Sequence, residues 1–129
     1  MRFIGLEPLA SDVGIIELET DDFGYVDLYN YADLRSVCVD YEQRALELVF
    51  ALPDSRTLVL RFEQISRWSV SSDGYAFTDM RHNEFNFLSA PPPPVGDVSY
   101  ELGVDLVDTS FLFDAEVVRV FAPTENQRR

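Results

Sequence analysis

The fold is decided by the stretch ALELVFALPDSRTLVLRF, which runs from Ala45 to Phe62. Each half alternates strictly between large apolar side chains and other side chains, the period-two pattern of a β-strand. The large apolar residues are Leu46, Leu48, Phe50 and Leu52 in the first half, and Leu58, Leu60 and Phe62 in the second. Between the halves, Pro53, Asp54 and Ser55 are turn formers, so the stretch is predicted to be a β-hairpin.

The charges of this hairpin predict its register. Placing both apolar sets on one face puts Leu48 opposite Leu60, and Glu47 then lies opposite Arg61. A slip of two residues would place Glu47 opposite Glu63, a like-charge pair that destabilises a sheet, so we expect the first register. It also pairs Phe50 with Leu58 and Val49 with Val59, and its three-residue loop requires a left-handed residue at Ser55 or Arg56.

A third strand, Ser36–Tyr41, is expected to extend the hairpin into a meander. Val37 and Val39 continue its apolar face, and Cys38 lies on the other face. A four-residue turn, Tyr41–Arg44, fixes the pairing, and three strands are the minimum that can stand with one face covered. The expected pairs are Val39 with Leu46, Val37 with Leu48 and Cys38 with Glu47.

The remaining segments are short and predominantly β-like. A turn is expected at Thr20–Gly24, and a single helical turn at Asn30–Leu34 with Asn30 as its N-cap. A second hairpin joins Val98–Val107 to Phe111–Phe121, with a kink at Asp114–Ala115 where the apolar alternation is disturbed. Further short strands or extended segments are expected at Gly14–Leu18, Tyr25–Tyr29, Glu63–Val70, Tyr75–Phe77 and Glu84–Leu88, with a turn at Ser71–Gly74 and a polar loop at Thr78–Asn83. The sequence therefore predicts a mainly β fold, an antiparallel β-sandwich or open barrel built from meanders, with little helix.

The 129 residues are expected to form a single β-rich domain, residues 1–122, followed by a polar C-terminal tail, residues 123–129. The segment Ala90–Gly96 contains the run Pro91–Pro94, which forces an extended polyproline II conformation. Two roles are open for this run. It can be a stiff connector between sheet segments, which we favour, or a ligand for a proline-recognising domain.

The net charge of −13 limits the partners. The chain has no lysine, and its ten basic residues are all arginine. Such an acidic chain is not expected to bind nucleic acid or an anionic membrane, because both need Lys and Arg to contact phosphates. The charge permits a basic protein partner, and it can equally serve solubility alone. Unprotected sheet edges leave a homodimer open as well.

Cysteine content and the N-terminus predict a cytoplasmic protein. Cys38 is the only cysteine, so no intramolecular disulfide can form, which fits a reducing compartment. The first ten residues, MRFIGLEPLA, do not read as a signal peptide. No apolar run approaches the ~20 residues that a transmembrane helix needs.

Nothing in the sequence predicts a catalytic, cofactor-binding or metal-binding residue. His82 is the only histidine, and a surface-loop position explains it better than a catalytic pair. Only Cys38 could join it in a transition-metal site, which usually needs two or more such ligands. Trp68 is expected to be a core or rim aromatic. The nucleotide-binding and hydrolase motifs G-x-G-x-x-G, P-loop and G-x-S-x-G are absent.

Acidic side chains are numerous enough to fall close together by chance. Asp21 with Asp22, and Asp105 with Asp108 and Asp114, are two sets that could bind calcium or magnesium weakly. Neither set has the D-x-D-x-D-G spacing of a calcium loop. A solvated acidic face is the favoured interpretation, and no cofactor is expected.

The run DLRSVCVDYEQRAL, Asp33–Leu46, followed after Glu47 by LVFALPDSRTLVLRFEQIS, resembles small uncharacterised bacterial domains. Some of these domains are grouped with the immunity proteins of polymorphic toxin systems. The resemblance covers about residues 33–66, and Glu63-Gln64-Ile65 stands where those domains carry a Gly-Val-like step. It implies a β-rich fold and a protein-binding role, and it carries over no functional residue.

Three functions remain open. The first is a non-enzymatic domain that binds another protein, such as a basic toxin neutralised in the manner of an immunity protein. The second is a small-molecule-binding β-barrel with an aromatic-lined cavity. The third, and least favoured, is an enzyme that uses a carboxylate pair, which would require converging carboxylates with raised pKa values.

Overall fold

The computed structural model describes residues 2–9, 17–72, 86–88, 95–106 and 109–123. Within these ranges the chain forms twelve strands and turns, and no helix. The strands belong to three sheets, each of which has two free edges among the described residues, so none of them closes into a barrel. The predicted mainly β, antiparallel fold is therefore confirmed, in its open form.

The largest sheet has five strands in the order β1-β12-β7-β6-β5. All of its neighbouring strands are antiparallel except β1 and β12, which are parallel. The bounds of these strands are β1 (Arg2–Ile4), β5 (Asp33–Asp40), β6 (Ala45–Ala51), β7 (Thr57–Glu63) and β12 (Val117–Phe121).

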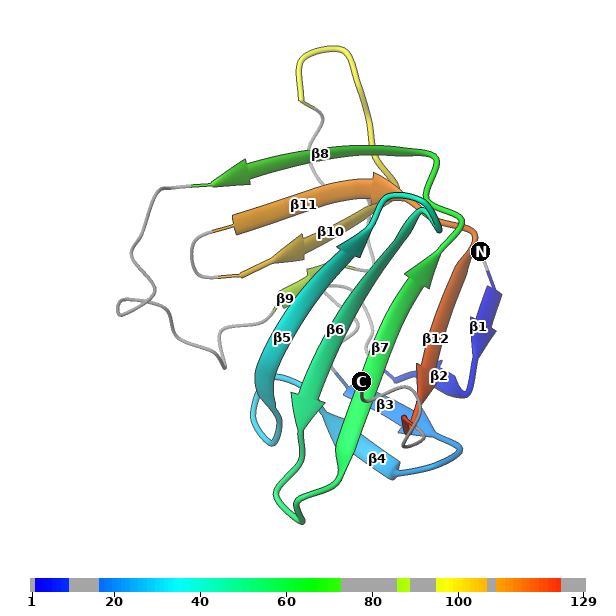
Figure 1. Ribbon diagram of the computed structural model, residues 1–129, viewed down its shortest axis with the longest axis vertical. Coiled ribbons are helices and arrows are strands. Elements are labelled where there is room, and N and C mark those ends of the chain that lie inside the picture. Colours follow the sequence, from blue (N-terminus) through cyan, green and yellow to red (C-terminus); the bar gives the residue numbers. More distant parts are fainter. Residues whose placement is uncertain (1, 10–16, 73–85, 89–94, 107–108, 124–129) are drawn as a thin grey trace.

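The two smaller sheets lie at opposite ends of the five-stranded sheet in Figure 1. A four-stranded sheet, in the order β8-β11-β10-β9, lies near the end where β7 finishes. A three-stranded sheet, in the order β2-β3-β4, lies near the opposite end. Their strands are β8 (Arg67–Ser72), β9 (Asn86–Leu88), β10 (Leu102–Asp105) and β11 (Thr109–Asp114), and β2 (Leu6–Pro8), β3 (Glu17–Thr20) and β4 (Gly24–Asp27).

One buried apolar cluster draws side chains from all three sheets. Leu18 of the three-stranded sheet, Phe62 of the five-stranded sheet and Phe113 of the four-stranded sheet are all fully buried. The rings of Phe62 and Phe113 meet edge to face, with centroids 5.1 Å apart. Such contacts between sheets remove apolar surface from water and pack it closely. The removal of apolar surface from water is the main favourable term in folding.

The central hairpin has the predicted register. Leu48 pairs with Leu60, and Glu47 pairs with Arg61. Phe50 with Leu58 and Val49 with Val59 also pair as expected. In the loop, Ser55 takes the left-handed conformation with φ of 71°. The loop is closed by Ser55 N, which donates to Leu52 O, and by Asp54 Oδ1, which accepts from Arg56 N.

The three-stranded meander is confirmed, with one difference at its outer strand. Val39 pairs with Leu46, Val37 with Leu48 and Cys38 with Glu47, as predicted. Val37 nevertheless remains 37% exposed, because β5 is an edge strand of this sheet and no described strand lies on its free side. The register shifts between Leu34 and Ser36, a β-bulge that interrupts the first half of this edge.

The chain changes sheets at two paired corners. Between β7 and β8 it bends at Gln64, whose φ is 57°, and between β11 and β12 it bends after Asp114. The two bends are hydrogen-bonded to each other: Ser66 N donates to Asp114 O at 3.1 Å, and Glu116 N donates to Glu63 O at 3.2 Å. The kink expected at Asp114–Ala115 is thus the point where one predicted strand divides between two sheets.

Several local predictions are wrong or fall elsewhere. The segment Asn30–Leu34 is not a helical turn, because β5 already begins at Asp33 and the preceding turn is capped by Asp27 rather than Asn30. In Val98–Val107 the strand begins only at Leu102, since Val98 closes a tight turn with Val95. Ser71 and Ser72 lie in β8 rather than in a turn. The predictions for Tyr75–Phe77, Thr78–Asn83, Pro91–Pro94 and the tail after residue 123 lie outside the described residues.

Truncating a side chain on the core face of the hairpin should reduce the stability of the protein. Leu48→Ala or Leu60→Ala is expected to reduce the free energy of unfolding by about 2–5 kcal/mol, because each side chain is fully buried. The matched control is Val37→Ala, which truncates the exposed partner of Leu48 on the edge strand. Denaturant titration measures all three, and a loss below about half a kcal/mol for Leu60→Ala would contradict this placement of the core.

Candidate functional site

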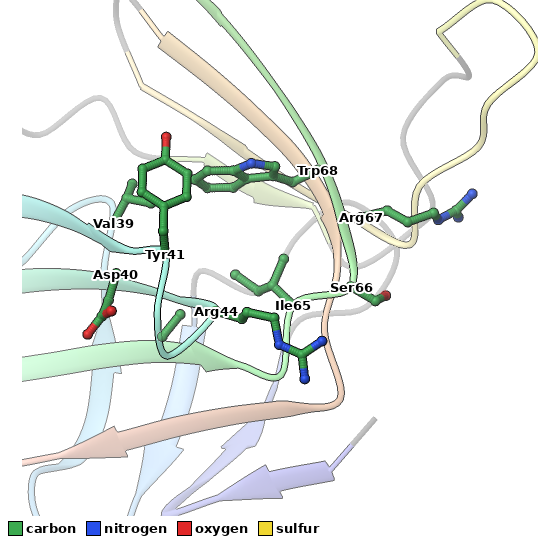
Figure 2. A pocket seen from close by; sticks show the side chains of 9 residues that line it. Val39, Asp40, Tyr41, Arg44, Ile65, Ser66, Arg67 and Trp68 are labelled. Carbon is green, nitrogen blue, oxygen red and sulfur yellow. The ribbon is translucent and has the colours of Figure 1, made fainter.

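A pocket lies where the turn between β5 and β6 meets the corner between β7 and β8 (Figure 2). The turn is fixed by Asp40 Oδ1, which accepts from Gln43 N at 3.0 Å, and by the left-handed Arg44 with φ of 52°. Arg44 O accepts a hydrogen bond from Ile65 N at 3.0 Å, which ties the turn to the corner. Backbone bonds therefore hold both walls of the pocket.

The pocket has a volume of about 180 Å³ and an aromatic wall. Trp68 stacks on Phe111 with ring centroids 6.0 Å apart and an interplanar angle of 28°. Tyr41 meets Trp68 edge to face at 5.7 Å and 85°. Ala45 and Ile65, both buried, complete the apolar part of the lining. Trp68 is half-buried, so it is a rim aromatic, as predicted, and its ring also faces this hollow.

Asp114 organises the corner beside the pocket. Its carboxylate accepts from Arg67 Nε at 2.6 Å and from Glu101 N at 2.9 Å. Arg67 Nη2 also donates to Ser99 O at 2.6 Å. Burial favours the neutral form of Asp114, but the hydrogen bonds from Arg67 and Glu101 outweigh it and lower the pKa of the carboxyl.

Three exposed tyrosines lie on β4 and on the loop that leads into β5, at the opposite end of β5, and we call Tyr25, Tyr29 and Tyr31 the tyrosine surface. Their exposed fractions are 49%, 46% and 59%. Tyr25 and Tyr31 also line a shallow pocket of about 220 Å³ together with Pro53 and Asp54. The hydrogen bond from the Tyr25 hydroxyl to Glu17 Oε1, 2.7 Å long, raises the pKa of Tyr25 to about 12.

The loop that carries Tyr29 and Tyr31 is held by the buried Asp27. Asp27 Oδ1 accepts from Tyr29 N and from Asn30 N, both at 2.9 Å, and Oδ2 accepts from Asn30 Nδ2 at 2.8 Å. Asp27 O accepts from Tyr31 N at 3.0 Å. An Asx turn of this kind replaces secondary structure in fixing a loop. The two aromatic side chains are therefore presented on an ordered backbone.

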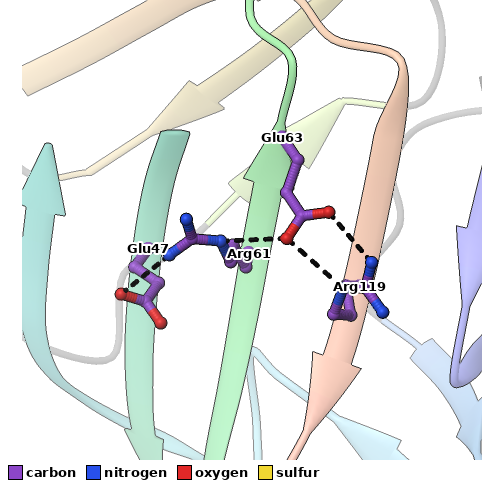
Figure 3. A network of polar contacts seen from close by, with 4 residues as sticks. All are labelled: Glu47, Arg61, Glu63 and Arg119. Atoms are coloured by element: carbon purple, nitrogen blue, oxygen red, sulfur yellow. Dashed lines mark hydrogen bonds and ion pairs between the residues drawn. The ribbon is translucent and has the colours of Figure 1, made fainter. Parts of the chain in front are cut away.

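The outer face of the five-stranded sheet carries an ion-pair network across three strands (Figure 3). Arg61 lies between Glu47 at 3.3 Å and Glu63 at 3.0 Å, and Arg119 contacts Glu63 at 3.1 Å. Partial burial opposes the charged form of Glu63, but hydrogen bonds from Arg119 and Arg61 prevail and lower its pKa. A carboxylate held ionised in this way suits a structural role.

The acidic sets singled out in the sequence do not come together as sites. Asp21 and Asp22 are exposed in the turn between β3 and β4, and Asp114 pairs with Arg67. Asp105 lies in β10, whereas Asp108 and His82 lie outside the described residues. In the described ranges, no group of three or more His, Cys, Asp or Glu side chains is arranged to hold a metal ion. Cys38 is exposed on β5.

Sequence reasoning missed both aromatic sites. The segment DLYNY, Asp27–Tyr31, contained part of the signal, because an Asp side chain often bonds the backbone two residues on and so forms an Asx turn. The pocket gave no such signal, since its walls come from two turns that are distant in the sequence.

Comparison with protein-family models finds no matching family, and comparison with curated proteins finds no matching relative. Across the described part of the chain, no helix has the length and apolar character needed to cross a membrane.

Acid should remove the stabilisation that Asp114 provides. Its pKa in the folded protein lies below the ordinary value of 3.8, so the unfolded chain binds the proton first as the pH falls. The contribution is therefore present above that value and is lost as the pH falls through the folded pKa. Asp114→Asn is expected to reduce the free energy of unfolding by about 1–3 kcal/mol at neutral pH, with a smaller difference from wild type near pH 3.

The control for that measurement is Glu42→Gln, which removes one negative charge from an exposed turn position. Its unfolding free energy should follow that of the wild type across the same pH range. A difference between Asp114→Asn and wild type that stays constant with pH would show that the Arg67 pair does not depend on ionised Asp114.

Metal ions should leave the thermal stability unchanged. Described carboxylates such as Asp114, Glu63 and Asp54 bond to arginines. A ligand that binds only the native state would raise the melting temperature by mass action. Calcium, magnesium and zinc are each expected to give the same melting temperature as a chelator-treated sample, and a rise of several degrees would contradict this expectation.

Proposed function

We propose that this protein is a non-enzymatic protein-binding module that contacts its partner through the tyrosine surface. The observation that carries the proposal is the display of Tyr29 and Tyr31 on a loop fixed by the buried Asp27. Tyrosine is enriched at protein interfaces because it offers a large amphipathic contact area with only two side-chain torsions to order.

The ordered loop lowers the free-energy cost of binding a partner. Association loses free energy when loops and side chains must be immobilised, and a preformed loop reduces that loss. Asp27 already accepts the hydrogen bonds of Tyr29 N, Asn30 N and the Asn30 side chain in the free protein. The shallow pocket beside Tyr31 adds a hollow for a partner side chain.

The charge of the chain selects a basic partner. The net charge is −13, and Glu17 lies at the tyrosine surface itself, whereas Asp54 there is paired with Arg56 at 2.6 Å. An acidic surface attracts a basic protein over long range and makes the association rate depend on salt. A basic toxin is the partner that the resemblance to immunity proteins suggests, and neutralisation of that toxin would be the activity.

The other two functions have less support. An enzyme that uses a carboxylate as a general acid needs a raised pKa, whereas those of Asp54, Glu63 and Asp114 are lowered. The described sheets are open, so the small-molecule hypothesis does not rest on a barrel cavity. It rests instead on the surface pocket beside Trp68.

Affinity capture from the native host, followed by kinetic measurement with the purified partner, tests the proposal. The partner is expected to be basic, and its association rate should fall steeply with added salt. The double variant Tyr29→Ala/Tyr31→Ala should weaken binding by about tenfold or more, as loss of interface aromatic anchors does.

The matched control is Tyr41→Ala, which removes a tyrosine that is 77% exposed at the other end of β5. It should leave the affinity unchanged. An acidic partner, an association rate indifferent to salt, or equal affinity for the double variant and wild type would each overturn the proposal.

A further inference from the structure

We propose that the pocket between the β5–β6 turn and the β7–β8 corner binds a small planar aromatic anion, such as an aromatic carboxylate. The proposal concerns the opposite end of β5 from the tyrosine surface, and it does not depend on the proposed function. It is argued from the wall of the pocket, its charge, its size and its rigidity.

The aromatic wall favours a flat ligand. Trp68 is held in place by Phe111, which stacks behind it, and by the edge of Tyr41. In Figure 2 the indole lies beside Tyr41 with Ile65 below the two rings. A flat ligand can stack or pack edge to face against these rings, arrangements that aromatic pairs prefer and that add to simple apolar burial.

The charge of the pocket favours an anion, because Arg44 has no ion pair with any described carboxylate. Asp40, the acidic neighbour in the lining, points away from the hollow in Figure 2 and accepts the hydrogen bond of Gln43 N. Arg67 also points away and is bound to Asp114. Most other described arginines do have carboxylate partners: Arg35, Arg56, Arg61, Arg67 and Arg119.

An arginine that no described carboxylate pairs, beside an apolar hollow, is unusual in a chain with 23 acidic residues and ten basic ones. Its planar guanidinium presents donors in a fork that matches a carboxylate. The pocket thus combines a stacking wall with a local cation.

The size of the pocket favours a ligand of one or two rings. Its volume of about 180 Å³ lies below the roughly 300–1,000 Å³ of sites for drug-sized molecules. The buried Ala45 and Ile65 close the hollow on the apolar side. The backbone bond from Ile65 N to Arg44 O fixes the Arg44 backbone near that floor without a ligand, so only the side chain of Arg44 must be ordered on binding.

The test uses 1-naphthoate as the probe and NMR of the full chain as the readout. Trp68 is the only tryptophan, so its indole N–H gives a single side-chain signal that reports on this pocket alone. Naphthoate is expected to shift that signal saturably, with a dissociation constant of about 1 mM or tighter, as the ligand efficiency of a molecule of this size implies. No saturable shift up to about ten times that concentration would overturn the proposal.

Two comparisons test the role of Arg44. Arg44→Gln should raise the dissociation constant for naphthoate about three- to fivefold, the upper part of the range for an exposed ion pair. The control Arg35→Gln removes an exposed arginine at the other end of β5 and should bind as wild type does. Equal weakening in both variants, or none in either, would overturn the assignment of Arg44 as the anion-binding group.

A neutral analogue keeps the test independent of any variant. The alcohol 1-naphthalenemethanol has the same ring system without the charge, so it should bind the wild type more weakly than naphthoate. It should also bind the wild type and Arg44→Gln equally. If the alcohol binds the wild type as tightly as naphthoate does, the pocket recognises apolar rings only and the proposed anion specificity is wrong.

Discussion

The backbone pairing at the corner between β7–β8 and β11–β12 is the interaction on which the rest of the structure depends. Two bonds, Ser66 N to Asp114 O and Glu116 N to Glu63 O, let a pair of strands leave one sheet and enter another without losing its partner. A bend in one strand alone would leave buried backbone groups unsatisfied, which is unfavourable. Because both bend together, the four-stranded sheet can fold over the five-stranded sheet and enclose the core.

The same corner holds a nearly buried carboxylate, that of Asp114. Asp114 lies at the bend with little exposure, and it is stabilised there by Arg67 and Glu101 N. In a chain so rich in carboxylates, each arginine that is placed between acidic groups reduces local repulsion, as Arg61 does between Glu47 and Glu63. These arginines stabilise the sheets, and the remaining carboxylates give the surface its negative charge.

The edge strand β5 connects the two aromatic sites. Its first residue, Asp33, follows the loop of the tyrosine surface, and after its last residue, Asp40, the chain enters the turn that lines the pocket. A β-bulge next to Leu34 interrupts this edge, which reduces its tendency to pair with another strand. Self-association through the sheet edges stays a prediction, and the two sites proposed to bind other molecules lie at the two ends of β5.

The sequence by itself determined the central meander. Alternation fixed which side chains of Ala45–Phe62 face the core, and the charges of Glu47 and Arg61 selected the register that is observed. The need for a left-handed residue identified Ser55 or Arg56, and Ser55 takes it. These are contacts between residues close in sequence, where strand periodicity and turn chemistry leave few alternatives.

Only the tertiary structure decided the corner and the sites. Nothing near Asp114 in the sequence indicates Arg67 as its partner, because the two meet only after two strands have changed sheets. Trp68 and Arg44 likewise come together through the bond between Ile65 N and Arg44 O. Local propensity also failed at Asn30–Leu34, where pairing of β5 with β6 overrode a helical turn. Long-range pairing decides such positions, and the hydrophobic pattern of a single strand does not specify which sheet it will join.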